Sequence, residues 1–387
     1  TIELDRHNIV VSIKLDRENP YLTGAFVIDA NVDYTNSATR SVTLTFNCDD
    51  GLGSGCADYR YSFDGNFDGS AANETTWVTY PTATGTDVIQ LLDVQGTQTV
   101  TVQYRDGVGR LSPTDSDAIF LDNIVPNTSD DYASKSTNGW TNADVTVIVS
   151  PSDSAGSANS GIDVTNYCSE VEGAAQCTYV TTTPSGNTTP INMPFASVAD
   201  SVVVYNLRYY STDLAANAQT DVVTQVKIDL EKPVTTTPFD GSTWVGGSGT
   251  TVTLNPTDNS GSGIDYTRYC VDGNNTCTNW TQVTPTGSVN VPVNNTGAIQ
   301  YVRFYSVDKM GNVEAQINSV EVRIDATAPT TTVSDPTPTA TDYINDSVYT
   351  VTVTPADAGS GVANTYYCFE ATTASPCNPS AAMPVAG

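Results

Sequence analysis

A pattern that occurs four times along the chain limits the possible fold more than any other feature. Its clearest copy is TDNSGSGIDYTRYCVDG at residues 257–273, and further copies begin at Asp49, Asp153 and Asp357. Each copy has an acidic residue followed by a Gly-rich loop, and in three of them a cysteine lies seven residues after the last glycine of the loop. Repetition at about 100 residues indicates a tandem array of similar domains.

The repeats also share the way they end. An aspartate lies four residues before a proline at Asp16, Asp122, Asp229 and Asp325. Because proline cannot continue a sheet ladder, each of these prolines separates one domain from the next. We therefore expect residues 1–20 to hold the last strand or strands of a preceding or neighbouring domain. Complete domains are expected at 21–122, 123–229 and 230–325, and an incomplete domain at 326–387.

Alternating apolar and polar residues predict that these domains are all-β. Runs such as 41–46, 145–149, 202–210 and 300–307 alternate over short lengths and are bounded by Gly, Asn, Asp or Pro. This pattern predicts about seven strands per repeat in a β-sandwich. Short linkers ending in proline leave little slack between domains, so we expect tandem immunoglobulin-like sandwiches arranged as an elongated rod.

The repeated motifs resemble bacterial-type immunoglobulin-like tandem repeats. The resemblance lies in the Asp-x-x-Gly-Ser-Gly loop, the Tyr-Cys strand after it, YSVDKMGN at 305–312 and VRIDATAP at 322–329, and it covers nearly the whole chain. Such repeats occur in large surface adhesins of bacteria and archaea and as spacers in secreted hydrolases. The resemblance implies the immunoglobulin-like fold, but it is weak for function because such modules serve several purposes.

The eight cysteines occur as four close pairs, one in each repeat. Such spacing is typical of disulfides formed in an oxidising compartment, and the pairs lack the two-residue gap of zinc knuckles. The first repeat has Ser62 where the third has Cys270, and its Cys56 stands at the place of Ile264, so its bridge is expected to span the Gly-rich loop. The expected disulfides are Cys48–Cys56, Cys168–Cys177, Cys270–Cys277 and Cys368–Cys377.

Charge and composition exclude several classes of partner. The chain has 15 Lys and Arg against 43 Asp and Glu, a net charge of −28, which would repel nucleic acids and anionic membranes. No run of 18 apolar residues is present, so we expect no membrane-spanning segment. The sequence thus predicts an extracellular or cell-surface protein.

A catalytic function is not expected. His7 is the only histidine, so nucleophile–base–acid arrangements lack their usual base. The 43 acidic residues make chance pairs of carboxylates inevitable, so such pairs do not indicate glycoside hydrolysis.

The repeated aspartates support two interpretations. In the first, each aspartate caps a turn through its own side chain, as Asp before Gly commonly does. In the second, several aspartates converge at a domain junction and bind Ca²⁺. The spacing lacks the dense D-x-D-x-D of a dedicated calcium loop, which favours turn capping, and no cofactor other than Ca²⁺ is expected. The aspartates that open the Gly-rich loops are Asp50, Asp153, Asp258 and Asp357, those of the linkers are Asp16, Asp122, Asp229 and Asp325, and those of the late hairpins are Asp106, Asp213 and Asp308.

Other polar residues are candidates for local roles. Asn217 and Asn312 are expected to take the left-handed conformation in their hairpin turns. Seven Asn-x-Ser/Thr sequons are candidate glycosylation sites, although a chain so rich in Asn and Thr has about as many by chance. The sequons are at Asn73, Asn127, Asn187, Asn274, Asn279, Asn294 and Asn345.

These features predict an extracellular structural or adhesive protein whose repeats form a cell-surface stalk or filament. Its partners would be flanking repeats of a longer chain, other copies of itself, or a surface glycan or protein. In one version residues 1–387 are a window on a longer array; in the other, the first strands of one copy complete the fourth sandwich of another by donor-strand addition. Against the second version, joining two copies offers 18 residues where the third repeat uses 32.

A function of another class is also consistent with the sequence. The repeats could be carbohydrate-binding or spacer modules of a secreted polysaccharide-degrading enzyme, with Trp77 and Trp280 as the aromatic candidates. Packing within the domain is the expectation we favour for both side chains.

Overall fold

The computed structural model describes residues 14–69, 75–82, 85–153, 158–182, 190–334, 348–369 and 377–382. The chain divides into two compact units, residues 1–139, 144–196 and 204–227 in the first and residues 140–143, 197–203 and 228–387 in the second. Among the described residues, no helix is long and apolar enough to cross a membrane.

The first unit contains sandwich 1, which is formed by β1–β10. Its two main sheets have the orders β2-β4-β8 and β3-β10-β9-β6-β7, and β1 pairs with β5. A 3-10 turn, η1, covers Asp29–Asn31. The strands are β1 Tyr21–Leu22, β2 Val27–Ile28, β3 Tyr34–Thr35, β4 Ser41–Thr45, β5 Cys48–Asp49, β6 Cys56–Ser62, β7 Val78–Thr79, β8 Thr86–Gln90, β9 Gly96–Asp106 and β10 Asp115–Leu121.

Sandwich 2 is formed by β11–β17 and lies in the first unit except for the ends of its last two strands. Its sheets have the orders β11-β12-β15 and β14-β13-β16-β17. The single turn of helix α1, Tyr132–Lys135, follows β11. The strands are β11 Ser129–Asp130, β12 Val145–Ser150, β13 Ile162–Val171, β14 Val180–Thr181, β15 Ile191–Phe195, β16 Val202–Asp213 and β17 Val222–Asp229.

The second unit contains sandwich 3, formed by β18–β25, and the strands that follow it. Sandwich 3 has the sheet orders β18-β20-β23 and β19-β25-β24-β21-β22. Its strands are β18 Val234–Thr236, β19 Trp244–Gly246, β20 Gly249–Thr257, β21 Ile264–Asp272, β22 Thr281–Val283, β23 Val289–Asn294, β24 Gln300–Asp308 and β25 Asn318–Asp325. The last repeat has two described pairs, β26 Thr330–Ser334 with β27 Thr352–Ala356 and β28 Tyr366–Tyr367 with β29 Ala381–Ala382.

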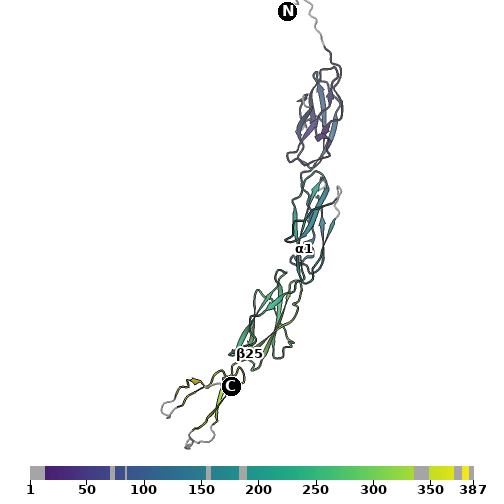
Figure 1. Cartoon of the computed structure of the whole chain (residues 1–387). Helices are drawn as coiled ribbons and strands as arrows, with labels where there is room; N and C mark the ends of the chain where they lie inside the picture. Colours follow the sequence, from purple (N-terminus) through teal and green to yellow (C-terminus); the bar gives the residue numbers. More distant parts are fainter. Residues whose placement is uncertain are drawn as a thin grey trace, which may run out of the picture. The chain divides into compact units, whose positions relative to one another are not determined.

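The cores follow from the alternation along the longest strands. In β9 and β24 nearly every second side chain is buried, as expected when one face of a strand packs against a facing sheet. In sandwich 1 the core includes the rings of Phe46, Tyr59 and Tyr104, and in sandwich 3 it is mainly valine. Figure 1 shows the strands of sandwich 1 (purple and blue) and of sandwich 3 (green) in two layers.

Strand order identifies the fold as tandem immunoglobulin-like sandwiches. In sandwiches 1 and 3 one sheet is built from early strands and one later strand, while the other sheet brings the last two strands beside the middle ones, with chain crossings between sheets. An edge strand near the start of each of these sandwiches pairs in parallel with its last strand, β3 with β10 and β19 with β25. In sandwich 2 an isolated parallel bridge joins Thr141 to Ile228. The all-β, immunoglobulin-like prediction is confirmed.

The limits of the domains remain our proposal. Within the described residues, no strand pair joins residues on opposite sides of Asp122, Asp229 or Asp325. This grouping supports domains at 21–122, 123–229 and 230–325, followed by the repeat at 326–387. Residues 1–13, which include most of the strand expected before residue 20, lie outside the described residues.

All four expected disulfides are present, and they staple two different places. Cys168–Cys177 and Cys270–Cys277 tie a strand to the loop that follows it, as does Cys368–Cys377. Cys48–Cys56 instead closes the Gly-rich loop. The pairing of Cys56 with Asp106 corresponds to that of Ile264 with Asp308, so Cys56 does occupy the place of Ile264.

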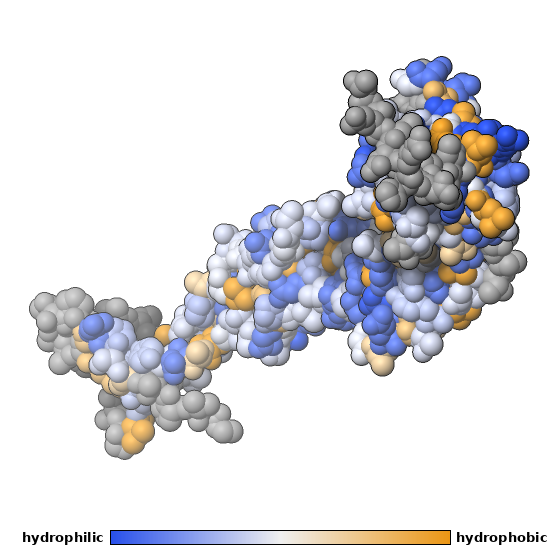
Figure 2. Space-filling model, turned by 90° about the horizontal axis from the view of Figure 1, so that it is seen from above, coloured by the Kyte–Doolittle hydropathy of each residue, from blue (hydrophilic) through white to orange (hydrophobic). Residues whose placement is uncertain are grey.

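The surface in view in Figure 2 is mostly hydrophilic or near-neutral in hydropathy. On this face, hydrophobic residues appear singly or in small groups (Figure 2). Scattered apolar residues of this kind are normal on soluble domains.

Leu254 offers a test of the core of sandwich 3. Its side chain is fully buried in β20, so Leu254→Ala should lower the stability of this sandwich by about 2–5 kcal/mol through lost burial and the cavity left behind. Amide exchange of peptides from 230–325, followed over a urea series, measures the change. Ile317→Ala, at a side chain that is 47% exposed, is the matched control. Equal losses in both variants would contradict the assigned core.

Candidate functional site

Each of the first three repeats brings together three aspartates from distant parts of the sequence. We call them the linker, loop and hairpin aspartates, and in each repeat one carboxylate oxygen or more from each lies within 4.8 Å of the others. The three groups are junction site 1, Asp16, Asp50 and Asp106; junction site 2, Asp122, Asp153 and Asp213; and junction site 3, Asp229, Asp258 and Asp308.

The linker aspartate contacts both its own linker and the Gly-rich loop of the following repeat. In site 3, Asp229 Oδ1 accepts a hydrogen bond from Glu231 N (3.0 Å) and Oδ2 accepts one from Ser262 N (2.6 Å). The same contact to a loop serine recurs in the other repeats, from Ser54 to Asp16, from Ser160 to Asp122 and from Ser360 to Asp325. One carboxylate therefore closes the linker turn and holds the next loop.

The loop aspartate closes the Gly-rich loop on itself. Asp258 Oδ2 accepts a hydrogen bond from Gly263 N at 2.6 Å. Asp50 and Asp153 make the same bond with Gly55 and Gly161, both at 2.7 Å. This is the turn-capping role expected from the sequence, and it uses one oxygen of each of these three side chains.

The hairpin aspartate opens the turn between the last two strands. Asp308 Oδ1 accepts hydrogen bonds from Met310 N and Asn312 N, both at 2.8 Å. The Asn312 amide then donates to Asp308 Oδ2 (2.7 Å) and to the backbone carbonyl of Asp229 (3.1 Å). Asn217 makes the equivalent two bonds in site 2, to Asp213 and to the carbonyl of Asp122.

The expected left-handed conformation of the two asparagines is wrong. The residues with positive φ in these turns are Ala216 (φ 65°) and Gly311 (φ 87°), each one position earlier. The asparagines stay in the ordinary region because their amides bridge the hairpin to the linker. The sequence could have indicated this bridge, since both asparagines follow an aspartate by four residues.

A residue without a side chain lies between the linker and loop carboxylates. A Cβ on Gly261 would lie 2.7 Å from both Asp229 Oδ2 and Asp258 Oδ2. On Gly53 it would lie 2.2 Å from Asp50 Oδ2, and on Gly359 it would lie 2.5 Å from Asp325 Oδ2. In repeats 1, 3 and 4 the glycine before the loop serine thus leaves room for the close approach of a carboxylate, whereas repeat 2, whose loop is longer, has Asn159 at this position.

Burial and mutual repulsion shift the acidities of these groups. Loss of solvent, followed by the nearby charges of Asp229 and Asp308, raises the pKa of Asp258 to about 6, against the opposing hydrogen bond from Gly263. Desolvation likewise raises the pKa of Asp308. In site 2 it raises the pKa of both Asp153 and Asp213. Sites 2 and 3 therefore hold carboxylates that favour neutralisation.

Site 1 differs because Arg110 stands where the other hairpins have asparagine. The backbone bonds of Arg110 to Asp106 match those of Asn312 to Asp308. The pKa of Asp16 is lowered, first by the hydrogen bonds from Ser54 and, to a smaller extent, by the charge of Arg110. A positive side chain thus lies close enough to this site to act on its linker aspartate.

One oxygen of each loop aspartate in the three junction sites has no hydrogen-bond partner. Asp50 Oδ1, Asp153 Oδ1 and Asp258 Oδ1 are buried and accept no hydrogen bond. In site 1, Asp106 Oδ2 is in the same state, and in site 3 so is the Ser262 hydroxyl. Buried polar atoms without partners are costly, so these oxygens mark places where a ligand could bind.

The fourth repeat repeats part of the arrangement. Asp325 accepts from the Ser360 backbone and hydroxyl, at 2.7 and 2.8 Å, and Asp357 accepts from Gly361 N at 2.9 Å. Hydrogen bonds from Ser360 and Thr327 hold the pKa of Asp325 below its usual range. The predicted Ca²⁺ ligands of linker and loop thus meet in the first three repeats, where the hairpin aspartates join them, whereas in the fourth repeat Asp325 and Asp357 each hold the loop by hydrogen bonds.

The remaining candidate residues are the sequons and His7. Four of the sequons are exposed and three, Asn73, Asn187 and Asn345, lie outside the described residues; the exposed ones are Asn127, Asn274, Asn279 and Asn294. His7 also lies outside the described residues.

The two candidate sugar-stacking tryptophans are engaged within their own sandwiches. The guanidinium groups of Arg60 and Arg105 lie 4.7 and 4.6 Å from the centre of the Trp77 ring. The half-buried ring of Trp280 packs edge-on against Tyr305, with ring centres 5.1 Å apart. Both contacts agree with the packing role that we expected.

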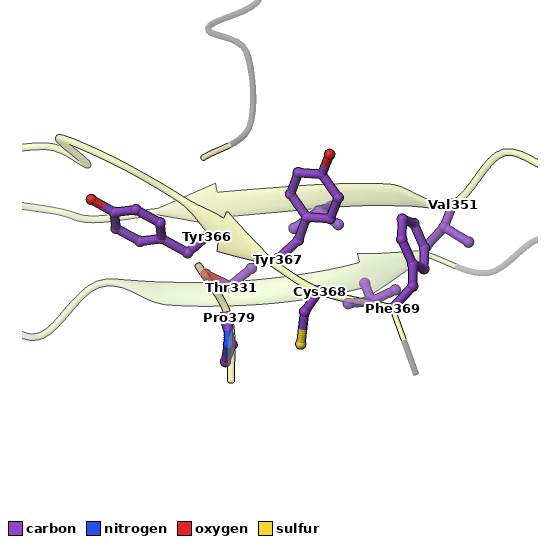
Figure 3. Close-up of a pocket in the computed structure, with 9 residues that line it drawn as sticks. Thr331, Val351, Tyr366, Tyr367, Cys368, Phe369 and Pro379 are labelled. Atoms are coloured by element: carbon purple, nitrogen blue, oxygen red, sulfur yellow. The ribbon is translucent and has the colours of Figure 1, made fainter. Parts of the chain in front are cut away.

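An apolar groove of about 530 Å³ lies on the fourth repeat, lined by β26–β28 and nearby residues. Figure 3 shows Phe369 beside Val351 at one end of the groove. Val351 is 39% exposed, whereas Val252, at the corresponding place in β20, is fully buried under the core of sandwich 3. Within the described residues of the fourth repeat, this face is therefore more open than its counterpart in sandwich 3.

Comparison with known proteins gives likenesses to solved structures alone. No family model matches the chain, and no curated protein matches it. Among solved structures, a tetra-tandem repeat from the extending region of a large adhesion protein is 15% identical with a TM-score of 0.30, covering 88% of this chain and 87% of that one. Fibronectin(III)-like modules of Clostridium thermocellum CbhA are 14% identical with a TM-score of 0.22, covering 48% and 88%.

A third similar structure comes from a vertebrate. The FN1-FN3 domains of chicken CNTN1 are 9% identical with a TM-score of 0.25, covering 79% of this chain and 99% of that one. At these scores the three likenesses support no statement about what this chain does.

The raised pKa of Asp258 predicts an unusual dependence on pH in metal-free protein. Because its folded pKa of about 6 exceeds the ordinary value of about 3.9, its charged form destabilises the fold, and stability is regained as pH falls through 6. In the presence of chelator at pH 8, Asp258→Asn should therefore be more stable than wild type by up to about 2 kcal/mol and melt at a higher temperature. This difference in stability should be smaller at pH 5. Melting curves at both pH values measure it; an advantage that does not change with pH would contradict the shifted pKa.

The space around Gly261 gives a second test of the site. Gly261→Ala places a methyl group against two carboxylates and should cost about 1–3 kcal/mol in sandwich 3. Gly287→Ala is the matched control, since a Cβ there meets nothing within 4 Å. Urea unfolding followed by amide exchange of residues 230–325 compares them. If the two variants are equally stable, the close approach of the carboxylates is wrong.

Proposed function

We propose that this chain is an extracellular spacer, part of a cell-surface stalk or adhesin, in which immunoglobulin-like sandwiches hold other parts of a structure at a distance. The observation that carries the proposal is the contact of each linker aspartate with the loop of the following repeat, which recurs at Asp16, Asp122, Asp229 and Asp325. A module built only to fold would not need the same contact at every linker.

The chemistry of the linker supports a restricted joint. The linker aspartate accepts a hydrogen bond from its own linker two residues on, which fixes the turn before the proline. Its other oxygen accepts from the following loop, and in sites 2 and 3 its carbonyl accepts from the hairpin asparagine. A linker fastened at three points has few free torsions, so the proposed rod would keep its spacing.

The disulfides, sequons and negative charge of the chain suit an extracellular location. Four local disulfides staple the repeats, and such bonds persist in oxidising surroundings. The exposed sequons would accept glycans in a suitable cell. The large negative charge keeps such a chain soluble and discourages contact with anionic surfaces.

A second candidate is a filament in which copies join by strand addition. The groove on the fourth repeat favours it, because the apolar or aromatic side chains of Val333 in β26 and Tyr366 in β28 line it and are exposed. Residues 9–15, IVVSIKL, alternate in the way that an inserted strand requires. We place this candidate second because the linker contact that supports the spacer recurs in all four repeats, and a carbohydrate-binding module third because Trp77 and Trp280 pack within their own sandwiches.

Solution mass separates the first two candidates. For a single-chain spacer we expect a monodisperse monomer by light scattering, near 40.9 kDa for wild type and correspondingly lighter after deletion of residues 1–16. For strand addition we expect regular multimers or fibres that disappear on the same deletion. Multimers that survive the deletion would contradict strand addition through these residues, and multimers that it abolishes would contradict the spacer as the primary role.

A further inference from the structure

Junction sites 2 and 3 carry more negative charge than nearby side chains neutralise. Each gathers three buried carboxylates, and among the ion pairs of the described residues none includes any of the six. Beside Gly161 in site 2 lies the apolar side chain of Leu214. In site 3 a Cβ on Gly263 would lie 3.3 Å from Lys309 Nζ, but among the described residues no ion pair joins Lys309 to the three carboxylates. Carboxylates this close repel one another strongly away from water, so both sites are suited to a bound cation.

The unpartnered oxygens point to where such a cation would bind. Asp153 is 9% exposed and Asp258 is 7% exposed, yet each has one buried oxygen that accepts no hydrogen bond. The other oxygen of each is held by a glycine N–H, which fixes the orientation of the carboxylate. Since buried carboxylate oxygens normally have partners, an oriented oxygen left free is a ready ligand.

The donor atoms and their spacing select the kind of ion. Ca²⁺ takes six to eight oxygen ligands at 2.3–2.6 Å, so two oxygens on opposite sides of one ion are about 5 Å apart. The three ligand atoms of each site lie within 4.8 Å of one another, which one such ion can span. Zn²⁺ prefers nitrogen and sulfur, and Mg²⁺ keeps most of its water, so neither fits a set of three carboxylates as well.

We propose that the two sites each bind one Ca²⁺ ion, through Asp122, Asp153 and Asp213 in site 2 and through Asp229, Asp258 and Asp308 in site 3. Backbone carbonyls and water complete the coordination. Each ion then joins the linker to the loop and to the hairpin of the repeat that follows it. This inference stands whether or not the chain serves as a spacer.

Site 1 binds Ca²⁺ more weakly for a reason visible in its residues. Its hairpin has Arg110 at the position of Asn217 and Asn312, and the guanidinium reduces the negative charge felt at Asp16. Its linker aspartate is also less buried than Asp122 and Asp229. Affinity for Ca²⁺ rises with the number of ligand charges that no nearby cation compensates, so sites 2 and 3 are the tight ones.

Calorimetric titration of the chelator-treated full chain with CaCl₂ tests the proposal. Wild type should bind two ions more tightly than any other, Asp153→Asn and Asp258→Asn should each lose one, and the double variant should lose both. The matched controls are Asp163→Asn and Asp265→Asn, which change the residues just after the Ile that begins β13 and β21. Failure of wild type to take up Ca²⁺, or full uptake by the double variant, would overturn the proposal.

Two further measurements keep the test valid if a variant folds poorly. Melting of wild type should rise by about 5 °C or more between chelator and saturating CaCl₂, and equal MgCl₂ should not reproduce the rise. Identical midpoints in chelator and CaCl₂ would overturn the proposal without any variant. Arg110→Asn should add a third tight event; if it does not, the weakness assigned to site 1 is wrong.

Discussion

The hydrogen bond from a loop serine N–H to a linker aspartate is the contact on which the rest of the junction depends. It draws a carboxylate at the end of one repeat into the Gly-rich loop of the next, as between Asp229 and Ser262. Once that carboxylate is in place, the loop can carry only a glycine at 261, and the loop aspartate must turn its second oxygen elsewhere. The composition of the loop is thus a consequence of what lies against it.

The junctions bring like charges together, and the backbone makes this tolerable. The carboxylates of sites 2 and 3 each accept one or more backbone N–H groups, so part of the charge is balanced by fixed dipoles. The balance is incomplete, because one oxygen of each loop aspartate accepts no hydrogen bond. Folding of the sandwiches therefore brings together carboxylates whose negative charge the protein alone does not neutralise, and this charge suits the junction to cation binding.

Much of the fold was accessible from the sequence because its signals are local and repeated. Alternating runs, prolines after linkers and paired cysteines each depend on a few neighbouring residues, and four copies confirmed one another. The junction sites were only partly accessible. The repeats indicated that Asp258 and Asp229 belong to one junction, but their separation and the state of each oxygen depend on strand register and burial.

The hairpin asparagines show where local reasoning fails. From sequence alone, Asn312 beside Gly311 suggested a turn conformation, since asparagine tolerates the left-handed region. Its actual role depends on a carbonyl more than 80 residues earlier, at Asp229. The left-handed residue of this hairpin is instead Gly311. In sandwich 2 it is Ala216, which has a positive φ beside the Asn217 amide that bridges the hairpin to the linker.

The parallel pairing of early and last strands has a mechanical consequence. In sandwich 3, β19 and β25 run side by side in the same direction, from Trp244 opposite Arg323 to Gly246 opposite Asp325. Tension applied to the two ends of such a sandwich would slide these strands lengthwise, so their hydrogen bonds bear the load together. Antiparallel end strands would instead open like a zipper, one bond at a time. In sandwich 1, β3 pairs with β10 in the same parallel way. Sandwiches 1 and 3 therefore share a pair of parallel strands that would resist tension by shear.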